Sequence, residues 1–185
     1  MTVAPVLGPT SETPARVAHD TVLVLDFGSQ YSQLIARRVR EAKVYCELVP
    51  GGISADEVRR RGPKGLIFSG GPASVYASGA PQPDPEIYAI NVPILGICYG
   101  MQLIAHNLGG RVAASERREY GQASLTVDDD AGLFAKLPSE LSVWMSHGDV
   151  VTQLPQGFRS VAHSLNSPCA AAHVHQEVAQ HVASQ

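Results

Sequence analysis

The stretch VPILGICYGMQLIAHNLGG, residues 92–110, joins a strand pattern, a cysteine between glycines and a helix pattern in direct succession. Residues 92–97 are almost continuously apolar, which is typical of a strand buried on both faces of a parallel sheet. Residues 101–108 predict a helix, and the glycine pair that follows predicts its end. Cys98 therefore lies at a turn from strand to helix.

The same alternation continues toward the N-terminus. Apolar runs at 21–26, 44–49 and 65–69 predict three more strands, and helical patterns occur around 34–39 and at 55–61. Strands that alternate with helices indicate an α/β fold, a mostly parallel open sheet with helices on both faces. Such a sheet binds its ligands beyond the carboxyl ends of its strands.

The remaining segments have different patterns. Residues 1–20 are punctuated by proline and threonine and predict a flexible leader, so the folded domain is expected over 21–185. Residues 73–91 are rich in proline and predict a loop with one or two helical turns. From Arg111 onward, shorter strands separated by turns predict a small antiparallel extension of the sheet.

Composition narrows the class of protein. The 185 residues are enough for one domain, and a net charge of −3 gives no general attraction to nucleic acid or acidic membranes. No apolar run approaches the roughly 20 residues of a membrane span. The three widely spaced cysteines, Cys46, Cys98 and Cys169, favour free thiols in a reducing cytosol over a disulfide framework or a zinc site. We expect a cytoplasmic protein with no metal, nucleic-acid or membrane partner.

The cysteine turn, GICYG at 96–100, predicts a nucleophile. A sharp turn from strand to helix requires glycine at Gly96 and Gly100, because side chains there would clash with the tight backbone. The turn would expose the thiol of Cys98 at the positive end of the next helix, which favours the thiolate and lowers the thiol pKa. The alternative interpretation is that Cys98 is a small buried residue at the end of a core strand and not a nucleophile.

A glycine turn at the end of the neighbouring strand predicts a partner for this nucleophile. Acyl transfer requires N–H donors that stabilise the developing oxyanion, and the amides of Gly71 and Tyr99 are the candidates. Glycine-rich turns after strands also bind phosphates, but neither the Gly-x-Gly-x-x-Gly pattern nor the lysine-containing phosphate loop is present. A candidate oxyanion hole is the better interpretation.

Five motifs match one known enzyme family. They are DFGSQY at 26–31, SGGP at 69–72, GICYGMQ at 96–102, REYG at 118–121 and WMSHGD at 144–149. With them the chain resembles the class I, triad-type glutamine amidotransferases and, more narrowly, the amidotransferase domains of the GMP synthases. The similarity extends from about Thr21 to Ala172.

The resemblance implies an α/β fold and a Cys-His-Glu triad. Cys98 would attack the side-chain amide of glutamine, ammonia would leave, and water would resolve the glutamyl thioester. The resemblance also implies that the backbone amides of Gly71 and Tyr99 form the oxyanion hole. The residues that it implies for glutamine binding are Gly70, Gln102, Ser146, His147 and Asp149.

The family also implies a partner for this domain. Ammonia passes to a separate ATP-pyrophosphatase (synthetase) domain or subunit, which adenylates xanthosine monophosphate and aminates it to GMP. ATP and Mg²⁺ belong to that synthetase, for which these residues contain no candidate. No cofactor is expected in the amidotransferase domain itself.

The base and its orienting carboxylate have a weaker match. The family carries His-Pro-Glu on a late strand, and the nearest match is His175-Gln176-Glu177, in which glutamine replaces proline. Residues two apart on a strand point to the same face, so His175 and Glu177 could approach Cys98 together. His173 shares that face, so the base could be His173, His175 or neither of them.

The C-terminal end departs from the family in length. Relative to the family, a hairpin before His175 is deleted and no closing helix follows before Gln185, so the domain is expected to be incomplete. Three functions remain open: an active glutaminase subunit, a non-catalytic relative that binds glutamine or a synthetase, and a different hydrolase on this scaffold, such as a γ-glutamyl peptidase. The WMSHGD motif disfavours the peptidase.

Overall fold

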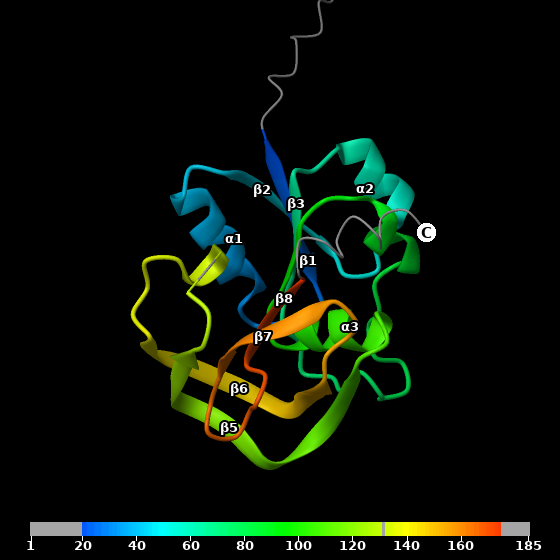
Figure 1. Ribbon diagram of the computed structural model, residues 1–185. Helices are drawn as coiled ribbons and strands as arrows, with labels where there is room; N and C mark the ends of the chain where they lie inside the picture. Colours follow the sequence, from blue (N-terminus) through cyan, green and yellow to red (C-terminus); the bar gives the residue numbers. More distant parts are fainter. Residues whose placement is uncertain (1–19, 131, 175–185) are drawn as a thin grey trace, which may run out of the picture.

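The computed structural model describes residues 20–130 and 132–174, with the side chains of 116–120, 146 and 147 excepted. Its first half forms a parallel sheet with strand order β2-β1-β3-β4, in the upper half of Figure 1. The pairing of β1 with β2 and β3, and of β3 with β4, is parallel throughout. The strands are β1 Thr21–Asp26, β2 Tyr45–Pro50, β3 Gly65–Phe68 and β4 Ile94–Gly96.

Helices cover both faces of this sheet. One face carries α1, and the Cys46 thiol of β2 donates a hydrogen bond of 3.2 Å to the Ala36 carbonyl of that helix. The helices of the other face bury residues in the main core cluster together with Leu23 and Leu25 of β1. The helices are α1 Ser32–Glu41, α2 Ala55–Arg61, the 3₁₀ helix η1 Pro85–Ala89 and α3 Tyr99–Asn107.

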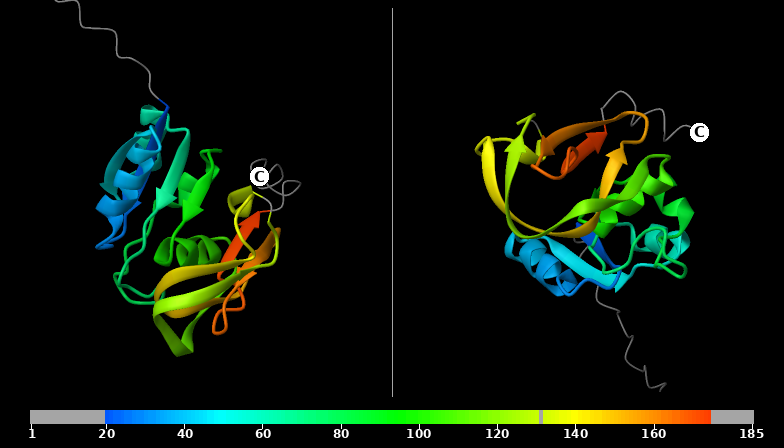
Figure 2. Two further views of the ribbon diagram at one scale, coloured as in Figure 1. Left: turned by 90° about the vertical axis from the view of Figure 1, so that its left-hand side faces the viewer. Right: turned by 90° about the horizontal axis from the view of Figure 1, so that it is seen from below.

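The second half of the chain forms an antiparallel sheet with strand order β6-β5-β7-β8. Figure 2 shows the long β5–β6 ribbon curling beside α3, which contacts both sheets. The elements are β5 Arg111–Val127, the 3₁₀ helix η2 Gly132–Phe134, β6 Glu140–Gln153, β7 Phe158–His163 and β8 Ala171–Val174.

The core lies between the parallel sheet and α3. Phe27, Phe68 and Tyr99 are buried together, and the ring of Phe27 lies 5.4 Å from that of Phe68 and 6.0 Å from that of Tyr99. Full burial stabilises a large apolar side chain by roughly 1.5–3 kcal/mol. This aromatic group joins the ends of β1 and β3 to the start of α3, so it fixes the edge of the sheet where ligands bind in such folds.

The α/β class, the parallel sheet and the helices on both faces are confirmed. The expectation of shorter strands after Arg111 is wrong, because β5 has 17 residues and β6 has 14. The two strands pair along most of their length across a register irregularity between Ala114 and Glu119. The predicted flexible leader lies outside the described residues, except for Asp20. Within the described part of the chain, no helix has the length and apolarity needed to cross a membrane.

Candidate active site

Cys98 occupies a strained turn between β4 and α3. Its backbone has φ 50° and ψ −110°, and it is the N-cap residue of α3. A positive φ is uncommon for a residue with a side chain and is seen often at functional sites. The cysteine is exposed, whereas Cys46 and Cys169 are buried. The structure therefore presents this one of the three thiols to solvent.

The glycines on both sides of Cys98 are required by close backbone packing, as predicted. A Cβ atom at Gly96 would lie 2.6 Å from the Met101 nitrogen, and one at Gly100 would lie 2.4 Å from the Phe68 carbonyl oxygen. The Ile97 amide donates to the same Phe68 oxygen at 3.0 Å. The turn is thus pressed against the end of β3.

The Gly70–Gly71 turn lies directly against the cysteine turn. A Cβ atom at Gly70 would lie 3.7 Å from the Cβ of Cys98, and one at Gly71 would lie 3.2 Å from the ring of Tyr99. Among the described residues, neither the Gly71 amide nor the Tyr99 amide donates a hydrogen bond within the chain. The first amides of a helix have no partner inside it. Two unpaired N–H groups therefore lie close to the thiol.

Ser69 is a residue of this region to which sequence analysis gave no role. Its side chain is fully buried, and its hydroxyl accepts a hydrogen bond of 3.0 Å from the Phe27 amide. The same hydroxyl donates to the Gly70 carbonyl oxygen at 2.9 Å. In the sequence Ser69 is the first residue of the SGGP motif, but neither that motif nor its place at a strand end indicates these two hydrogen bonds.

The electrostatic environment of Cys98 differs from the prediction. Desolvation by the surrounding atoms raises the pKa of the Cys98 thiol above its ordinary value. This direction is opposite to the lowering expected from the helix N-terminus, and its cause is desolvation. A thiol whose surroundings disfavour its charged form requires a base to remove its proton.

Two of the predicted glutamine-binding residues contact each other. The side-chain amide of Gln102, which is 7% exposed, donates a hydrogen bond of 2.9 Å to the Asp149 backbone carbonyl. Asp149 pairs with Ala114 in the ladder of β5 and β6. Gln102 therefore connects the helix that follows the nucleophile to the strand that carries the WMSHGD motif.

Strand pairing also brings two of the sequence motifs together. REYG and WMSHGD lie opposite each other, with Glu119 paired to His147, Tyr120 to Ser146 and Gly121 to Met145. The side chains of Ser146 and His147 are outside the described set. The predicted roles of these two residues in glutamine binding therefore stay predictions.

The predicted base and its carboxylate, His175 and Glu177, lie outside the described residues. The alternative base, His173, is described and is engaged on both ring nitrogens. Its Nε2 accepts a hydrogen bond of 2.9 Å from Arg159, and its Nδ1 donates to the Val174 carbonyl oxygen, also at 2.9 Å. His173 also lines a groove to which Cys98 does not contribute. This placement argues against His173 as the base.

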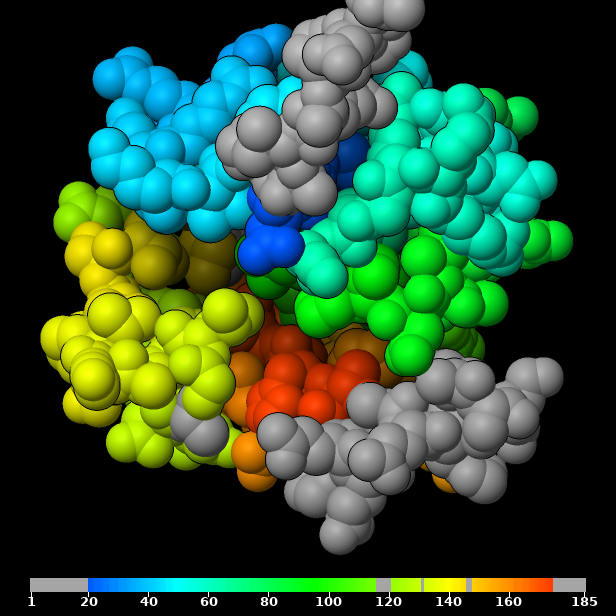
Figure 3. Space-filling view, turned by 90° about the horizontal axis from the view of Figure 1, so that it is seen from above, coloured from blue at the N-terminus to red at the C-terminus, as the bar shows by residue number. Residues whose placement is uncertain are grey.

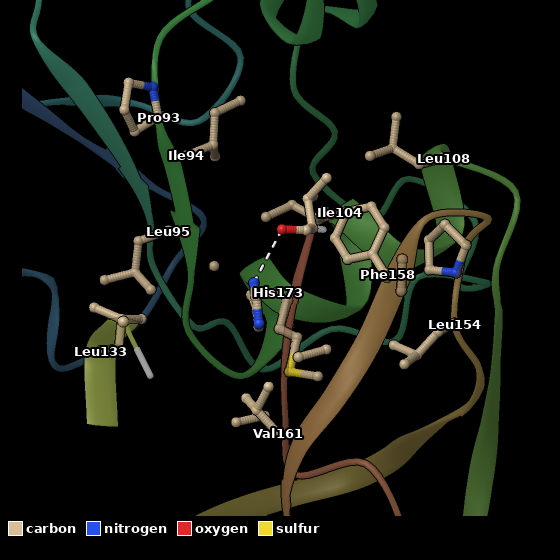
Figure 4. A pocket seen from close by; sticks show the side chains of 18 of the residues that line it. Pro93, Ile94, Leu95, Ile104, Leu108, Leu133, Leu154, Phe158, Val161 and His173 are labelled. Atoms are coloured by element: carbon tan, nitrogen blue, oxygen red, sulfur yellow. Dashed lines mark hydrogen bonds between the residues drawn. The ribbon is translucent and has the colours of Figure 1, made fainter. Parts of the chain in front are cut away.

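That groove, about 790 Å³ in volume, lies along the edge of β4 that has no strand partner among the described residues. Figure 4 shows apolar side chains from several elements around it, among them Ile94, Leu95, Ile104, Leu108 and Phe158. Figure 3 shows β8, in red, at the surface between the yellow segment near η2 and green residues. Because its walls are mostly apolar, the groove offers a packing surface beside the His173 imidazole.

The described residues contain no group of three or more His, Cys, Asp or Glu side chains that could hold a metal ion. What they do contain at the carboxyl edge of the parallel sheet is an exposed thiol and two unpaired backbone amides. Such a set is chemically suited to attack on a carbonyl carbon, because the thiol supplies the nucleophile and the amides can hold the oxyanion.

Comparison with known proteins gives the family. The model of the family described as glutamine amidotransferase class-I matches residues 23–185. The chain belongs to the class I glutamine amidotransferases.

Its relatives lie among the GMP synthases. Over 153 residues it is 56% identical to the glutamine-hydrolysing GMP synthase of Lactobacillus acidophilus, and over 154 residues it is 59% identical to that of Lactiplantibacillus plantarum. Each match covers 82% of this chain but only 30% of the relative, so the chain spans about a third of the length of these curated relatives.

A solved structure agrees with these matches. It is a Thermoplasma acidophilum protein described as one subunit of a GMP synthase, with 28% identity and a TM-score of 0.70. The alignment covers 86% of this chain and 80% of that protein. The chain is thus an amidotransferase domain related to the GMP synthases.

Proposed function

We propose that this chain carries out the glutaminase half-reaction of a GMP synthase. The Sγ atom of Cys98 attacks the side-chain carbonyl carbon of glutamine, and the carbon–nitrogen bond breaks as ammonia leaves with one added proton. Water then attacks the thioester, which releases glutamate and restores the thiol. The observation that carries this proposal is the exposed Cys98 thiol at a turn with φ 50°, beside the unpaired amides of Gly71 and Tyr99.

In this proposal the two amides hold the negative charge of the tetrahedral intermediate. Removal of one such donor in an acyl-transfer enzyme lowers the rate about 10²- to 10³-fold. Gly70, Gln102, Ser146, His147 and Asp149 are assigned to binding or positioning glutamine. The raised pKa of the thiol makes a base necessary, and His175 with Glu177 takes that role.

The ammonia is assigned to a separate synthetase domain or subunit that binds ATP and Mg²⁺ and aminates xanthosine monophosphate. Two observations support this partner: the names of the relatives, and the 30% of their length that the chain covers. The amidotransferase domain itself is proposed to function without a cofactor. Glutamine-dependent formation of GMP on addition of an ATP-dependent synthetase tests this half of the proposal.

A second candidate function is a domain that binds glutamine or a synthetase without turnover. The weak match at the base favours it, because Gln176 replaces the proline of the family's His-Pro-Glu and the Cys98 thiol depends on that base. The two candidates differ in the steps after attack by the thiol. The first forms ammonia continuously, whereas the second reacts with a glutamine-like electrophile once and forms no ammonia.

The decisive measurement is ammonia release from glutamine by the parent chain and four variants. Cys98→Ala, His175→Ala and Glu177→Gln are expected to lower the rate by at least about 10²-fold. His173→Ala is the matched control, since His173 lines the apolar groove, and it is expected to retain activity. Unchanged turnover in His175→Ala would reject the assignment of the base, and loss of activity in His173→Ala would transfer that role to His173.

A further inference from the structure

Ser69 directly follows β3 and connects the Gly70–Gly71 turn to Phe27, which follows β1. Its hydroxyl donates to the Gly70 carbonyl oxygen at 2.9 Å and accepts from the Phe27 amide at 3.0 Å. The side chain has no exposed surface, so water does not compete for either hydrogen bond. A buried hydroxyl that is satisfied in this way holds its partners in a fixed orientation.

The Gly70 carbonyl is one end of the peptide unit that carries the Gly71 amide. A trans peptide is planar, and its C=O and N–H groups point in opposite directions. A hydrogen bond that fixes the direction of the Gly70 oxygen therefore also fixes the direction of the Gly71 hydrogen. Two successive glycines otherwise leave this peptide unusually free to rotate.

The second oxyanion donor is connected to the same serine. The Phe27 amide donates to Ser69, and the ring of Phe27 packs edge-on against that of Tyr99 at 6.0 Å. The Tyr99 hydroxyl donates to the Pro81 carbonyl oxygen at 2.8 Å, which anchors the other side of this residue. Ser69 thus bonds directly to the peptide that carries the Gly71 amide. It also bonds to Phe27, whose ring packs on Tyr99, the residue of the second donor.

We propose that Ser69 is a positioning residue of the amidotransferase reaction, which turns the Gly71 N–H toward the oxyanion. This inference rests on the proposed function, in which the amides of Gly71 and Tyr99 hold that charge. Ser69 itself touches neither the substrate nor the reacting atoms. Its loss should slow the attack on a carbonyl group without changing the accessibility of the thiol.

The test compares two reactions of Cys98 in the same protein. In the first, a γ-thioester of glutamate transfers its acyl group to the Cys98 sulfur, the carbon–sulfur bond of the reagent breaks, and its thiol is released. That thiolate leaves without a general acid, so the predicted histidine is needed only to deprotonate Cys98, a step that the acylation shares with the alkylation below. In the second, iodoacetamide alkylates Cys98 at a saturated carbon, which generates no oxyanion. Mass spectrometry follows both rates at this residue.

Ser69→Ala is expected to lower the acylation rate about tenfold to a hundredfold, somewhat less than complete loss of a donor. The alkylation rate should stay within about twofold of the parent. Ser32→Ala is the matched control, since Ser32 is another buried serine, and it donates to the Asp26 carboxylate at 2.7 Å. This control should leave the ratio of the two rates unchanged. If Ser69→Ala does not fold, Ser69→Cys, which weakens both hydrogen bonds, should show a smaller fall in the same ratio.

Equal acylation rates in the parent and the Ser69 variants would overturn the inference. A parallel fall of acylation and alkylation would also overturn it, because that outcome means a structural role alone. If the parent chain is alkylated at Cys98 but not acylated, the proposed function fails and the inference fails with it. The parent protein alone gives that last result, so the two failures are distinguishable.

Discussion

The side-chain amide of Gln102 donates a hydrogen bond of 2.9 Å to the backbone carbonyl oxygen of Asp149. The bond joins α3, which begins at the nucleophile turn, to β6 of the antiparallel sheet. Apolar side chains make the same connection, since Leu103 of α3 lies in one buried cluster with Leu66 of β3 and Val151 of β6. The relative position of the thiol and the 146–149 segment therefore depends in part on one amide.

Gln102→Leu tests this dependence. The substitution keeps the approximate size of the side chain but removes this part-buried hydrogen bond to the Asp149 carbonyl, which costs about 0.5–1.5 kcal/mol. Urea unfolding should show a loss of this size in the free energy of unfolding. Asn107→Leu is the control, because the Asn107 amide on the same helix makes exposed hydrogen bonds only, to Gln82 and Tyr88. Equal losses in both variants would contradict the assigned role.

Gly100→Ala is expected to be one of the most damaging small substitutions in the chain. Its Cβ would lie 2.4 Å from the Phe68 carbonyl oxygen and 2.7 Å from the Phe68 Cβ, and neither atom can move without shifting β3. We expect a loss of about 2–4 kcal/mol in thermal unfolding, or failure to fold. Gly52→Ala, whose Cβ would have its nearest neighbour at 3.9 Å, should change stability by less than about 0.5 kcal/mol. The reverse order of the two variants would refute the packing argument.

The pH dependence of Cys98 alkylation tests the electrostatics of the site. Desolvation raises the pKa of the thiol above its ordinary value of 9.0, so the thiolate forms only as the pH rises past that value. The midpoint of the alkylation rate against pH should therefore lie higher in the native protein than in the urea-unfolded protein, which should show the ordinary thiol profile. Native labelling should modify one cysteine, because Cys46 and Cys169 are buried. A native midpoint below 9.0 would show that the helix N-terminus outweighs desolvation.

Asp84 should make stability depend on pH at the acid end. Its carboxylate accepts the Ala55 amide at 2.9 Å and the Glu86 amide at 3.0 Å, and these bonds lower the pKa of Asp84 below its ordinary value of 3.8. A depressed carboxyl pKa stabilises the native state above the unfolded pKa, and this contribution is lost as the pH falls through the native pKa.

The variant that tests this is Asp84→Ala. Its urea midpoint should lie below that of the parent at pH 7, and the gap should narrow as the pH falls below 3.8. Asp84→Asn, which keeps one carbonyl acceptor but does not titrate, should show an intermediate midpoint and no such narrowing. A gap that stays constant with pH would assign the effect to packing rather than to charge.

The order of strands and helices was predictable because each element carries its own periodic pattern. The bounds of α2 at 55–61 were predicted, since Ser54 accepts from the Glu57 amide and Gly62 ends the helix with φ 58°. β4 begins later than predicted, at Ile94, because the ladder there starts with the Pro93 carbonyl accepting from the Leu66 amide.

Features that depend on tertiary contacts were not predictable. The closeness of Gly70 to Cys98 followed from strand order, but the sign of the Cys98 pKa shift did not, because desolvation depends on atoms far apart in sequence. The length of β5 and its irregular register beyond Ala114 depend on pairing with β6, which local turn signals do not encode. The bond between Gln102 and Asp149 spans 47 positions and has no local signature.

The positive φ of Cys98 implies that the reactive thiol is kept at the expense of thermal stability. Holding a side chain in such a backbone conformation costs about 1–3 kcal/mol, and glycine would adopt it with little penalty. Cys98→Gly should therefore melt at a higher temperature than Cys98→Ala, although both lack the sulfur. Selection for a high melting temperature alone would favour glycine over cysteine at this position.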